Sequence, residues 1–278
     1  MDPFYQIREN TLRLPGVKGT HVFLHVSDTH VSTLDALSPY PEARRAFERE
    51  YAWSWVRRDF AAHFHEPYLP AHNLRSEAAF DKFMTLCADE KPEALLLSGD
   101  VLDFPHGAGW RFLQNRLSAL PMPVLYAPGN HEPGFFDLPE TRPYQGTDGL
   151  AVYRGEGFTI AAVDDSQKVL RPAQYPLLEK LFSEGTPLIL LMHDPLCTCF
   201  NRQEMSAFSE YYLVHEDSGD PLTARFIARC MAPDSPVAAI LCGHVHGYHL
   251  SEFAPGKVQI CASSGLIGFA HRFIIEGL

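Results

Sequence analysis

The sequence has no long hydrophobic run and few basic residues. It nowhere contains the roughly 18 consecutive apolar residues needed to cross a bilayer, so we expect no membrane-spanning helix. Its first twenty residues lack the apolar centre of a secretory signal peptide, which predicts a cytoplasmic protein. With 23 basic and 34 acidic residues the net charge is −11. This balance makes nucleic acid an unlikely partner, because nucleic-acid-binding proteins usually carry a basic face.

Cysteine is also scarce. Six cysteines are scattered over 278 residues, and several of them lie in apolar, strand-like segments. This distribution is typical of reduced, buried thiols in a cytoplasmic protein and does not suggest a disulfide framework.

What the sequence does contain is a series of short apolar runs that end in Gly, Asp, Asn or His. Each run has the length of a β-strand and is bounded by turn-forming residues. Because their hydrophobicity is continuous and does not alternate, the predicted strands belong to sheets covered on both faces. The runs are 21–28, 93–100, 122–130, 158–165, 187–194 and 237–244.

Helical patterns lie between many of these strands, for example at 77–89 and 172–183. Alternation of strand and helix predicts an α/β fold. No repeat, linker or low-complexity tract divides the chain, so we expect a single domain over 1–278. Two longer interruptions, at 31–76 and 196–235, follow predicted strands and are candidate lids.

The first of these interruptions contains a helical segment that begins near Pro41, a residue favoured in the first turn of a helix. Two tryptophans, Trp53 and Trp55, lie within it. They either cover part of a substrate or, as is more common for aromatic residues on a helix, belong to the core.

Five polar clusters follow the strands. Taken singly, their aspartates and asparagine are most often turn residues or helix caps. Together they offer carboxylate, imidazole and amide ligands, a mixture that suits Mn, Fe or Zn better than a thiolate site or an all-oxygen magnesium site. The clusters are Asp28-Thr29-His30, Gly99-Asp100-Val101-Leu102-Asp103, Gly129-Asn130-His131-Glu132, His193-Asp194-Pro195 and Gly243-His244-Val245-His246.

These clusters match, in order, the patterns D-x-H, G-D-x-x-D, G-N-H-[DE], H-x-P and G-H-x-H. The sequence thereby resembles the calcineurin-like metallophosphoesterase superfamily over residues 28–246. The resemblance implies two stacked mixed β-sheets flanked by helices, a four-layer sandwich. In this arrangement we expect the strand-like segments 258–265 and 271–276 to complete the second sheet.

The resemblance also implies a dinuclear metal site with two Mn, Fe or Zn ions. Asp100 would bridge the ions, and a hydroxide between them would attack phosphorus in line with the leaving oxygen. His131 would act as general acid, oriented by Asp103. The remaining metal ligands would be Asp28, His30 and His246 for one ion and Asn130, His193 and His244 for the other.

Departures from the pattern narrow the substrate class. Ser/Thr phosphoprotein phosphatases, a branch of the superfamily, carry an arginine after the second aspartate, whereas Phe104 and Pro105 follow Asp103 here. The acidic balance disfavours the superfamily's DNA-repair nucleases. The short blocks are most similar to bacterial class III cyclic-nucleotide-type phosphodiesterases, although the interruption at 31–76 is longer than in the simplest of these.

The sequence therefore predicts a metal-dependent phosphoesterase acting on a small-molecule phosphodiester or phosphomonoester. Nuclease activity is one alternative. The other is a catalytically silent protein-binding scaffold of the same fold, which should lack metal ligands or the residue corresponding to His131; none is missing here.

Overall fold

The computed structural model describes residues 4–67, 73–209 and 212–278. Their strands form two mixed sheets and one small sheet. The five-stranded sheet has the order β1 (Gln6–Leu14), β13 (Phe269–Gly277), β2 (Thr20–Val26), β3 (Leu95–Ser98), β4 (Val124–Ala127). The six-stranded sheet has the order β11 (His249–Ala254), β12 (Lys257–Cys261), β10 (Val237–Cys242), β7 (Leu188–Leu191), β6 (Phe158–Ala162), β5 (Ala151–Gly155). The small sheet pairs β8 (Leu196–Cys197) with β9 (Val214–His215).

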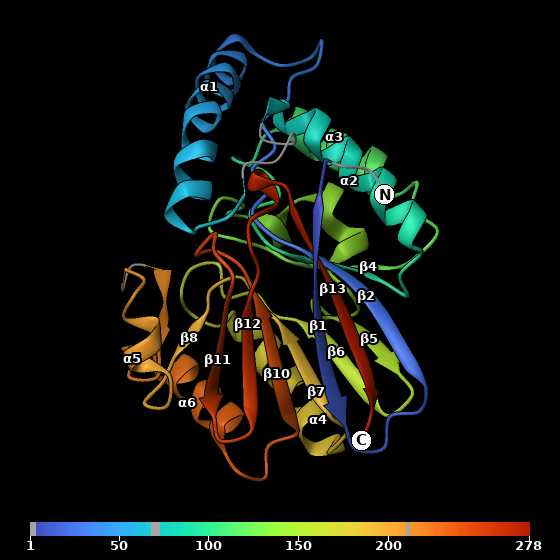
Figure 1. The fold of residues 1–278 in the computed structure, drawn as a ribbon, viewed down its shortest axis with the longest axis vertical. Coiled ribbons are helices and arrows are strands. Elements are labelled where there is room, and N and C mark those ends of the chain that lie inside the picture. Colours follow the sequence, from blue (N-terminus) through green and yellow to red (C-terminus); the bar gives the residue numbers. More distant parts are fainter. Residues whose placement is uncertain (1–3, 68–72, 210–211) are drawn as a thin grey trace.

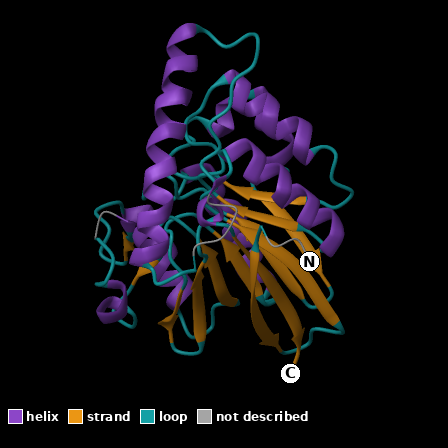
Figure 2. Ribbon diagram, turned by 45° about the horizontal axis from the view of Figure 1, so that its top comes forward, coloured by secondary structure: helices purple, strands orange, loops and turns teal. Residues whose placement is uncertain are grey.

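Helices lie outside the sheets and cover one end of the strands (Figure 2). The strands lie close together at this end and spread apart toward the other. The α-helices are α1 (Tyr40–His63), α2 (Ser76–Glu90), α3 (Gly107–Leu117), α4 (Tyr175–Glu184), α5 (Arg202–Met205) and α6 (Pro221–Met231). Short 3-10 helices span Phe135–Asp137, Pro139–Tyr144, Pro172–Gln174 and Gly265–Ile267. None of the helices described is long and apolar enough to cross a membrane.

Alternation along the buried strands creates the layers of the core. In β7, Leu188 and Leu190 pack into the cluster that contains α4 and α6, whereas Ile189 and Leu191 pack into the cluster between the two sheets. Because successive side chains point to opposite faces of a sheet, a continuous apolar strand can contact both layers. The predicted fold, two stacked mixed sheets flanked by helices, is confirmed.

One detail of that prediction is wrong. The segment 258–265 does supply β12 of the six-stranded sheet, but 271–276 lies in β13 of the other sheet, between β1 and β2. The sequence analysis also missed β1, the parallel neighbour of β13. Strand pairing between residues more than 250 positions apart leaves no local pattern, so the hydrophobicity of 271–276 identified a strand without identifying its partner.

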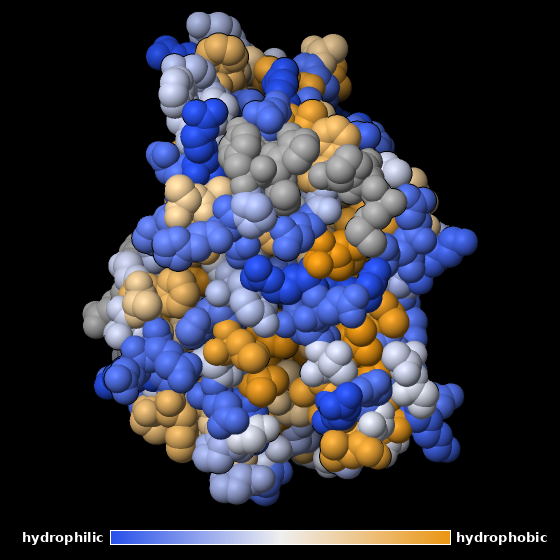
Figure 3. Space-filling view, viewed as in Figure 1, coloured by the Kyte–Doolittle hydropathy of each residue, from blue (hydrophilic) through white to orange (hydrophobic). Residues whose placement is uncertain are grey.

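The predicted helix within 31–76 is α1, with a proline in its first turn. Figure 1 shows α1 standing beside the loops at the upper ends of the strands, and hydrophilic or intermediate residues predominate over it in Figure 3. Four of its aromatic side chains are nevertheless exposed, including Trp55. Trp55 is therefore not a core residue.

Acid sensitivity is expected from His25, which is buried in β2 with its Nε2 2.7 Å from Ser98 Oγ. Burial lowers the pKa of His25 to about 4, despite the nearby Asp28 carboxylate. An unfolded chain, whose histidines titrate near 6.5, binds more protons between these values, so the free energy of unfolding falls as the pH drops from about 6.5 to about 4. Protonation of His25 accounts for a decrease in the free energy of unfolding on the order of 3 kcal/mol over this interval.

Urea unfolding of the metal-stripped protein at pH 7 and pH 4.5 measures this loss. The variant His25→Gln should lose markedly less stability over the interval, because its side chain does not titrate. An equal loss in both proteins would contradict the assignment.

Candidate metal centre

The predicted ligands all follow strands at one edge of the two sheets. Asp28 and His30 follow β2, Asp100 follows β3, Asn130 follows β4, His193 follows β7, and His244 and His246 follow β10. Five loops, distant in sequence, thus meet at one place, as the carboxyl ends of strands do in α/β folds.

The backbone at this place is unusual. Of the nine non-glycine residues with positive φ in the described part of the chain, five are predicted metal ligands: Asp28, His30, Asp100, His244 and His246, with φ between 45° and 67°. A left-handed conformation costs such residues about 1–2 kcal/mol each. The surrounding fold therefore maintains strain in the loops that carry the candidate ligands.

Glycines make room for these loops. A Cβ added to Gly129 would lie 2.2 Å from Asp100 Oδ1, and one added to Gly99 would lie 2.5 Å from His193 Nδ1. Real Cβ atoms do not approach this closely, so the glycines of the G-D and G-N motifs are required by packing against the ligands.

The first ligand cluster contains Asp28, His30 and His246. His30 Nε2 lies 3.1 Å from His246 Nε2, and that nitrogen lies 3.3 Å from Asp28 Oδ1. Although burial opposes ionisation, the neighbouring His246 and His193 rings lower the pKa of Asp28 to about 2. An ionised carboxylate with two imidazole nitrogens facing it is a suitable cation site.

The second cluster contains Asp100, His193 and His244, with Asn130 beside it. His193 Nε2 lies 3.4 Å from Asp100 Oδ2 and 3.1 Å from Asn130 Oδ1. The other ring nitrogen of His193, Nδ1, donates to the Ser98 carbonyl oxygen over 2.8 Å, so Nε2 is the nitrogen that faces the cluster.

Asp100 connects the two clusters. Its Oδ2 lies 3.4 Å from His193 Nε2 and 4.0 Å from His30 Nε2, so one carboxylate contacts ligands of both sites. Burial would raise the pKa of Asp100, but these histidines outweigh it and lower the pKa well below the usual range. The position and charge of Asp100 fit the bridging role implied by the sequence.

His244 supplies an independent test of whether the residues fit a metal. Its Nε2 is buried and forms no hydrogen bond within the described residues. Neither carboxylate oxygen of Asp194 forms one there, although Asp194 Oδ1 lies 3.1 Å from His244 Nε2. Burial, together with the His193 charge, lowers the pKa of His244 to about 2, which makes its ring neutral. A buried nitrogen lone pair without a donor is destabilising unless a cation binds it, so the donor set fits a metal ion.

Asp194 and Asp165 were missed as site residues by the sequence analysis. Asp165, at the end of the 158–165 run, accepts hydrogen bonds from the backbone of His193 (2.9 Å) and of Asp194 (3.0 Å). Their position at the ends of predicted strands could have identified them. They were missed because neither occupies a fixed residue of the five motifs.

His131 lies beside His30, with ring centroids 4.7 Å apart, and its side chain is 26% exposed. Its Nδ1 donates to the main-chain oxygen of Asp103 over 2.7 Å, and the Asp103 carboxylate oxygen Oδ1 is 3.3 Å away. Burial lowers the pKa of His131, but the Asp103 and Asp100 carboxylates outweigh it and raise the pKa to about 9. The two carboxylates therefore favour the protonated ring of His131, the form that a general acid requires.

The carboxylate of Asp103 is held by helix α1, which the sequence analysis did not foresee. Arg49 donates two hydrogen bonds to it, one of them 2.7 Å from Nη2 to Oδ1, and Trp53 Nε1 donates a third over 2.8 Å. Trp53 also stacks on His30, with ring centroids 4.4 Å apart. Trp53 is thus neither a core residue nor an exposed one, since it joins α1 to the candidate site.

Glu132 connects two of the loops that carry the candidate ligands. Its buried carboxylate accepts hydrogen bonds from the backbone N–H groups of Asp100 (3.2 Å), Leu102 (2.9 Å) and Gly129 (3.0 Å), and from the hydroxyl of Tyr126. Burial raises the pKa of Glu132 to about 7. One side chain therefore ties together the two loops that follow β3 and β4.

Replacing Glu132 by alanine would leave three buried N–H groups without an acceptor. We expect Glu132→Ala to destabilise the protein by about 3–5 kcal/mol and to weaken metal binding, because the position of Asp100 depends on these bonds. Glu132→Gln, which retains one acceptor oxygen, should lose less. Urea unfolding and metal analysis measure both effects, and a Glu132→Ala variant as stable as wild type would exclude this role.

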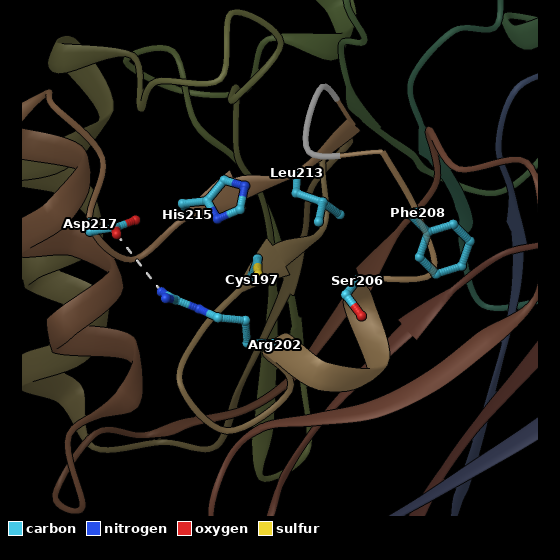
Figure 4. A pocket seen from close by; sticks show the side chains of 7 residues that line it. All are labelled: Cys197, Arg202, Ser206, Phe208, Leu213, His215 and Asp217. Atoms are coloured by element: carbon cyan, nitrogen blue, oxygen red, sulfur yellow. Dashed lines mark ion pairs between the residues drawn. The ribbon is translucent and has the colours of Figure 1, made fainter.

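The second candidate lid, 196–235, contains a separate cavity of about 510 Å³. Figure 4 shows Cys197 of β8 and His215 of β9 on adjacent strands, with Arg202 of α5 directed toward Asp217. None of its lining residues belongs to the two ligand clusters. Tyr212 of the same segment contacts His244, with ring centroids 5.0 Å apart, whereas the role of the segment as a lid remains a prediction.

Comparisons with known proteins identify the family of the chain. The family model described as calcineurin-like phosphoesterase matches residues 21–248. The chain therefore belongs to the calcineurin-like phosphoesterase family. No curated protein matches the sequence significantly.

Several solved structures are similar to this chain at low sequence identity. A dimetal phosphatase from Danio rerio is 11% identical with a TM-score of 0.50, and the match covers 88% of each chain. Purple acid phosphatase PPD1 from yellow lupin is 14% identical with a TM-score of 0.48, covering 91% of this chain and 45% of the lupin chain. GAP50, described as the anchor in the inner membrane complex of Plasmodium, is 10% identical with a TM-score of 0.42, covering 89% and 73%.

Proposed function

We propose that the protein hydrolyses a small-molecule phosphoester at a dinuclear metal centre. The observation that carries this proposal is the pair of nitrogen and oxygen clusters connected by the Asp100 carboxylate, which belongs to the second cluster and lies 4.0 Å from His30 Nε2 of the first. The ligands would be Asp28, His30 and His246 on one side, Asn130, His193 and His244 on the other, and Asp100 between them.

The ligand set suits Mn, Fe or Zn, because it mixes imidazole with carboxylate and amide oxygen. Two such ions, when bound, neutralise phosphoryl charge and lower the pKa of water toward neutrality. The protein would hold Asp100 and Asp28 ionised and fix the ring of His193 so that Nε2 faces the ions.

His131 would complete the reaction by protonating the leaving oxygen. Its Nδ1 is fixed by the Asp103 carbonyl, so its Nε2 carries the proton to be transferred. Ionised Asp103, held by Arg49 and Trp53, would favour the protonated ring. In-line hydrolysis with His131 as acid is the mechanism that this arrangement supports.

Within the family, the short motif blocks are similar to those of class III cyclic-nucleotide-type phosphodiesterases. The long segment 31–76 distinguishes this chain from the simplest of them, because α1 places Arg49 and Trp53 in the site. Because Arg49 and Trp53 occupy one side of the site, we propose a substrate that is smaller than a cyclic nucleotide or differently charged.

Metal-dependent hydrolysis of aryl phosphates tests the proposal. The protein is stripped of metal, reloaded separately with Mn, Fe, Zn or Mg, and assayed with p-nitrophenyl phosphate and bis-p-nitrophenyl phosphate. We expect turnover only after reloading, and its loss in Asn130→Ala. His249→Ala serves as a matched control, because this histidine follows His246 by three residues but belongs to neither cluster. Two bound ions without turnover of either ester would count against the proposed activity.

A further inference from the structure

Helix α1 presents one face to the candidate site. Arg49, Trp53 and Phe60 are four and seven residues apart, so they share a side of the helix. Arg49 and Trp53 bind Asp103, and the ring of Phe60 lies 4.8 Å from that of His246. At the end of the helix, Phe64 packs so closely on Gly247 that an added Cβ would lie 2.4 Å from its ring. The helix is therefore fixed against the site at both ends of this face.

This face brings a guanidinium group to the site. Arg49 binds the Asp103 carboxylate through Nε and Nη2, which uses two of its five N–H donors. The carboxylate is fully buried, whereas the Arg49 side chain is 37% exposed. The group is thus anchored on its inner side and retains donors for a further anion on its outer side.

The guanidinium also lies next to the candidate acid. The same oxygen, Asp103 Oδ1, is 2.7 Å from Arg49 Nη2 and 3.3 Å from His131 Nδ1. The sequence offers no arginine directly after Asp103, where Phe104 and Pro105 stand. Helix α1 therefore brings a positive charge to the Asp103–His131 pair from more than fifty residues earlier in the chain.

The charge of the Arg49 guanidinium affects which class of phosphoester the site binds. A phosphodiester has two non-bridging oxygens and one negative charge, whereas a phosphomonoester has a third such oxygen and up to two charges. Two metal ions suffice for two oxygens, and an arginine can bind a third through its planar set of donors. A guanidinium already held by a buried carboxylate needs little ordering when the anion arrives.

We propose that Arg49 binds a phosphoryl oxygen of the substrate and thereby selects a phosphomonoester over a phosphodiester. This inference rests on the proposed hydrolysis of phosphoesters at the same site. Arg49 acts as a specificity-determining residue contributed by α1, and the segment 31–76 forms part of the substrate-binding site.

The experiment uses the full chain reloaded with the metal that gives the highest turnover. Values of kcat/KM are measured for p-nitrophenyl phosphate and bis-p-nitrophenyl phosphate, and the affinity for inorganic phosphate is measured by calorimetry. The variants are Arg49→Lys, which keeps a cation beside Asp103, Arg49→Ala, and the control Arg44→Ala, an exposed arginine of α1 paired with Glu48. Thermal unfolding and metal analysis establish that each variant is folded and loaded.

Wild type should prefer the monoester. Arg49→Ala should weaken phosphate binding and lower kcat/KM for the monoester by about 10- to 100-fold, the effect of losing hydrogen bonds to a charged group. Arg49→Lys should show a smaller loss. Because Arg49 also holds Asp103 beside His131, the diester rate should fall too, but by clearly less than the monoester rate. Arg44→Ala should match wild type.

Three results would overturn the inference. These are a preference of wild type for the diester, equal losses for both esters in the Arg49 variants, or unchanged phosphate affinity in Arg49→Ala. If wild type hydrolyses neither ester, the proposed activity fails, and the calorimetric comparison still decides whether Arg49 binds phosphate.

Discussion

Asp100→Ala is expected to lose both metal ions and essentially all activity. The carboxylate of Asp100 contacts ligands of both clusters, so its removal opens both sites at once. Turnover should fall by at least about a thousandfold, because charge stabilisation by the ions and formation of the nucleophile fail together. Metal analysis after reloading and gel filtration, together with the aryl phosphate assay, measures the two losses.

Asp100→Asn is the companion variant. It keeps the shape of the side chain and suits the left-handed backbone at φ 51°, so a folding defect is less of a concern than in the alanine variant. Asp81→Ala, which removes a surface carboxylate paired with Arg116, provides the control. Full occupancy of both sites in the Asp100 variants would disprove the bridging assignment.

His131→Ala should also reduce turnover but, unlike Asp100→Ala, it should retain both metal ions. The His131 ring lies at the edge of the cluster and is partly exposed, with its Nδ1 bound to a main-chain oxygen. Losing a general acid typically lowers kcat by about 10²- to 10⁴-fold. The same metal analysis and assay as for Asp100 detect this separation of binding from turnover.

The leaving group distinguishes an acid from a residue that only positions substrate. A p-nitrophenolate leaves without much protonation, whereas a simple alkoxide does not, so the loss in His131→Ala should be greater for an alkyl phosphate than for an aryl phosphate. An equal loss for both esters, or a loss of metal, would argue against His131 as the acid.

Much of the candidate site could be predicted from sequence because its ligands lie directly after strands. Asp28, Asp100 and His244 each end an apolar run, and strand ends in α/β folds meet at one edge. The order of the motifs then indicated the family, and the structure brings all seven predicted ligands to one place.

The contribution of α1 could not be predicted in this way. Arg49 and Trp53 reach Asp103 only because a 24-residue helix packs across the loops, and the contact joins residues about fifty positions apart. Local sequence predicts the helix through its pattern and its first-turn proline, but the direction in which a helix packs is set by tertiary contacts. The wrong sheet for 271–276 has the same origin, since its partners β1 and β2 are distant in sequence.

The most direct test of the central claim, a dinuclear metal site, is anomalous X-ray scattering from crystals of the manganese-loaded protein. We predict two anomalous peaks per chain about 3.5–4 Å apart, the spacing usual for such centres. One peak should lie among Asp28, His30 and His246 and the other beside His193 and His244, with Asp100 between them. A single peak, or none at these residues in fully loaded protein, would contradict the account.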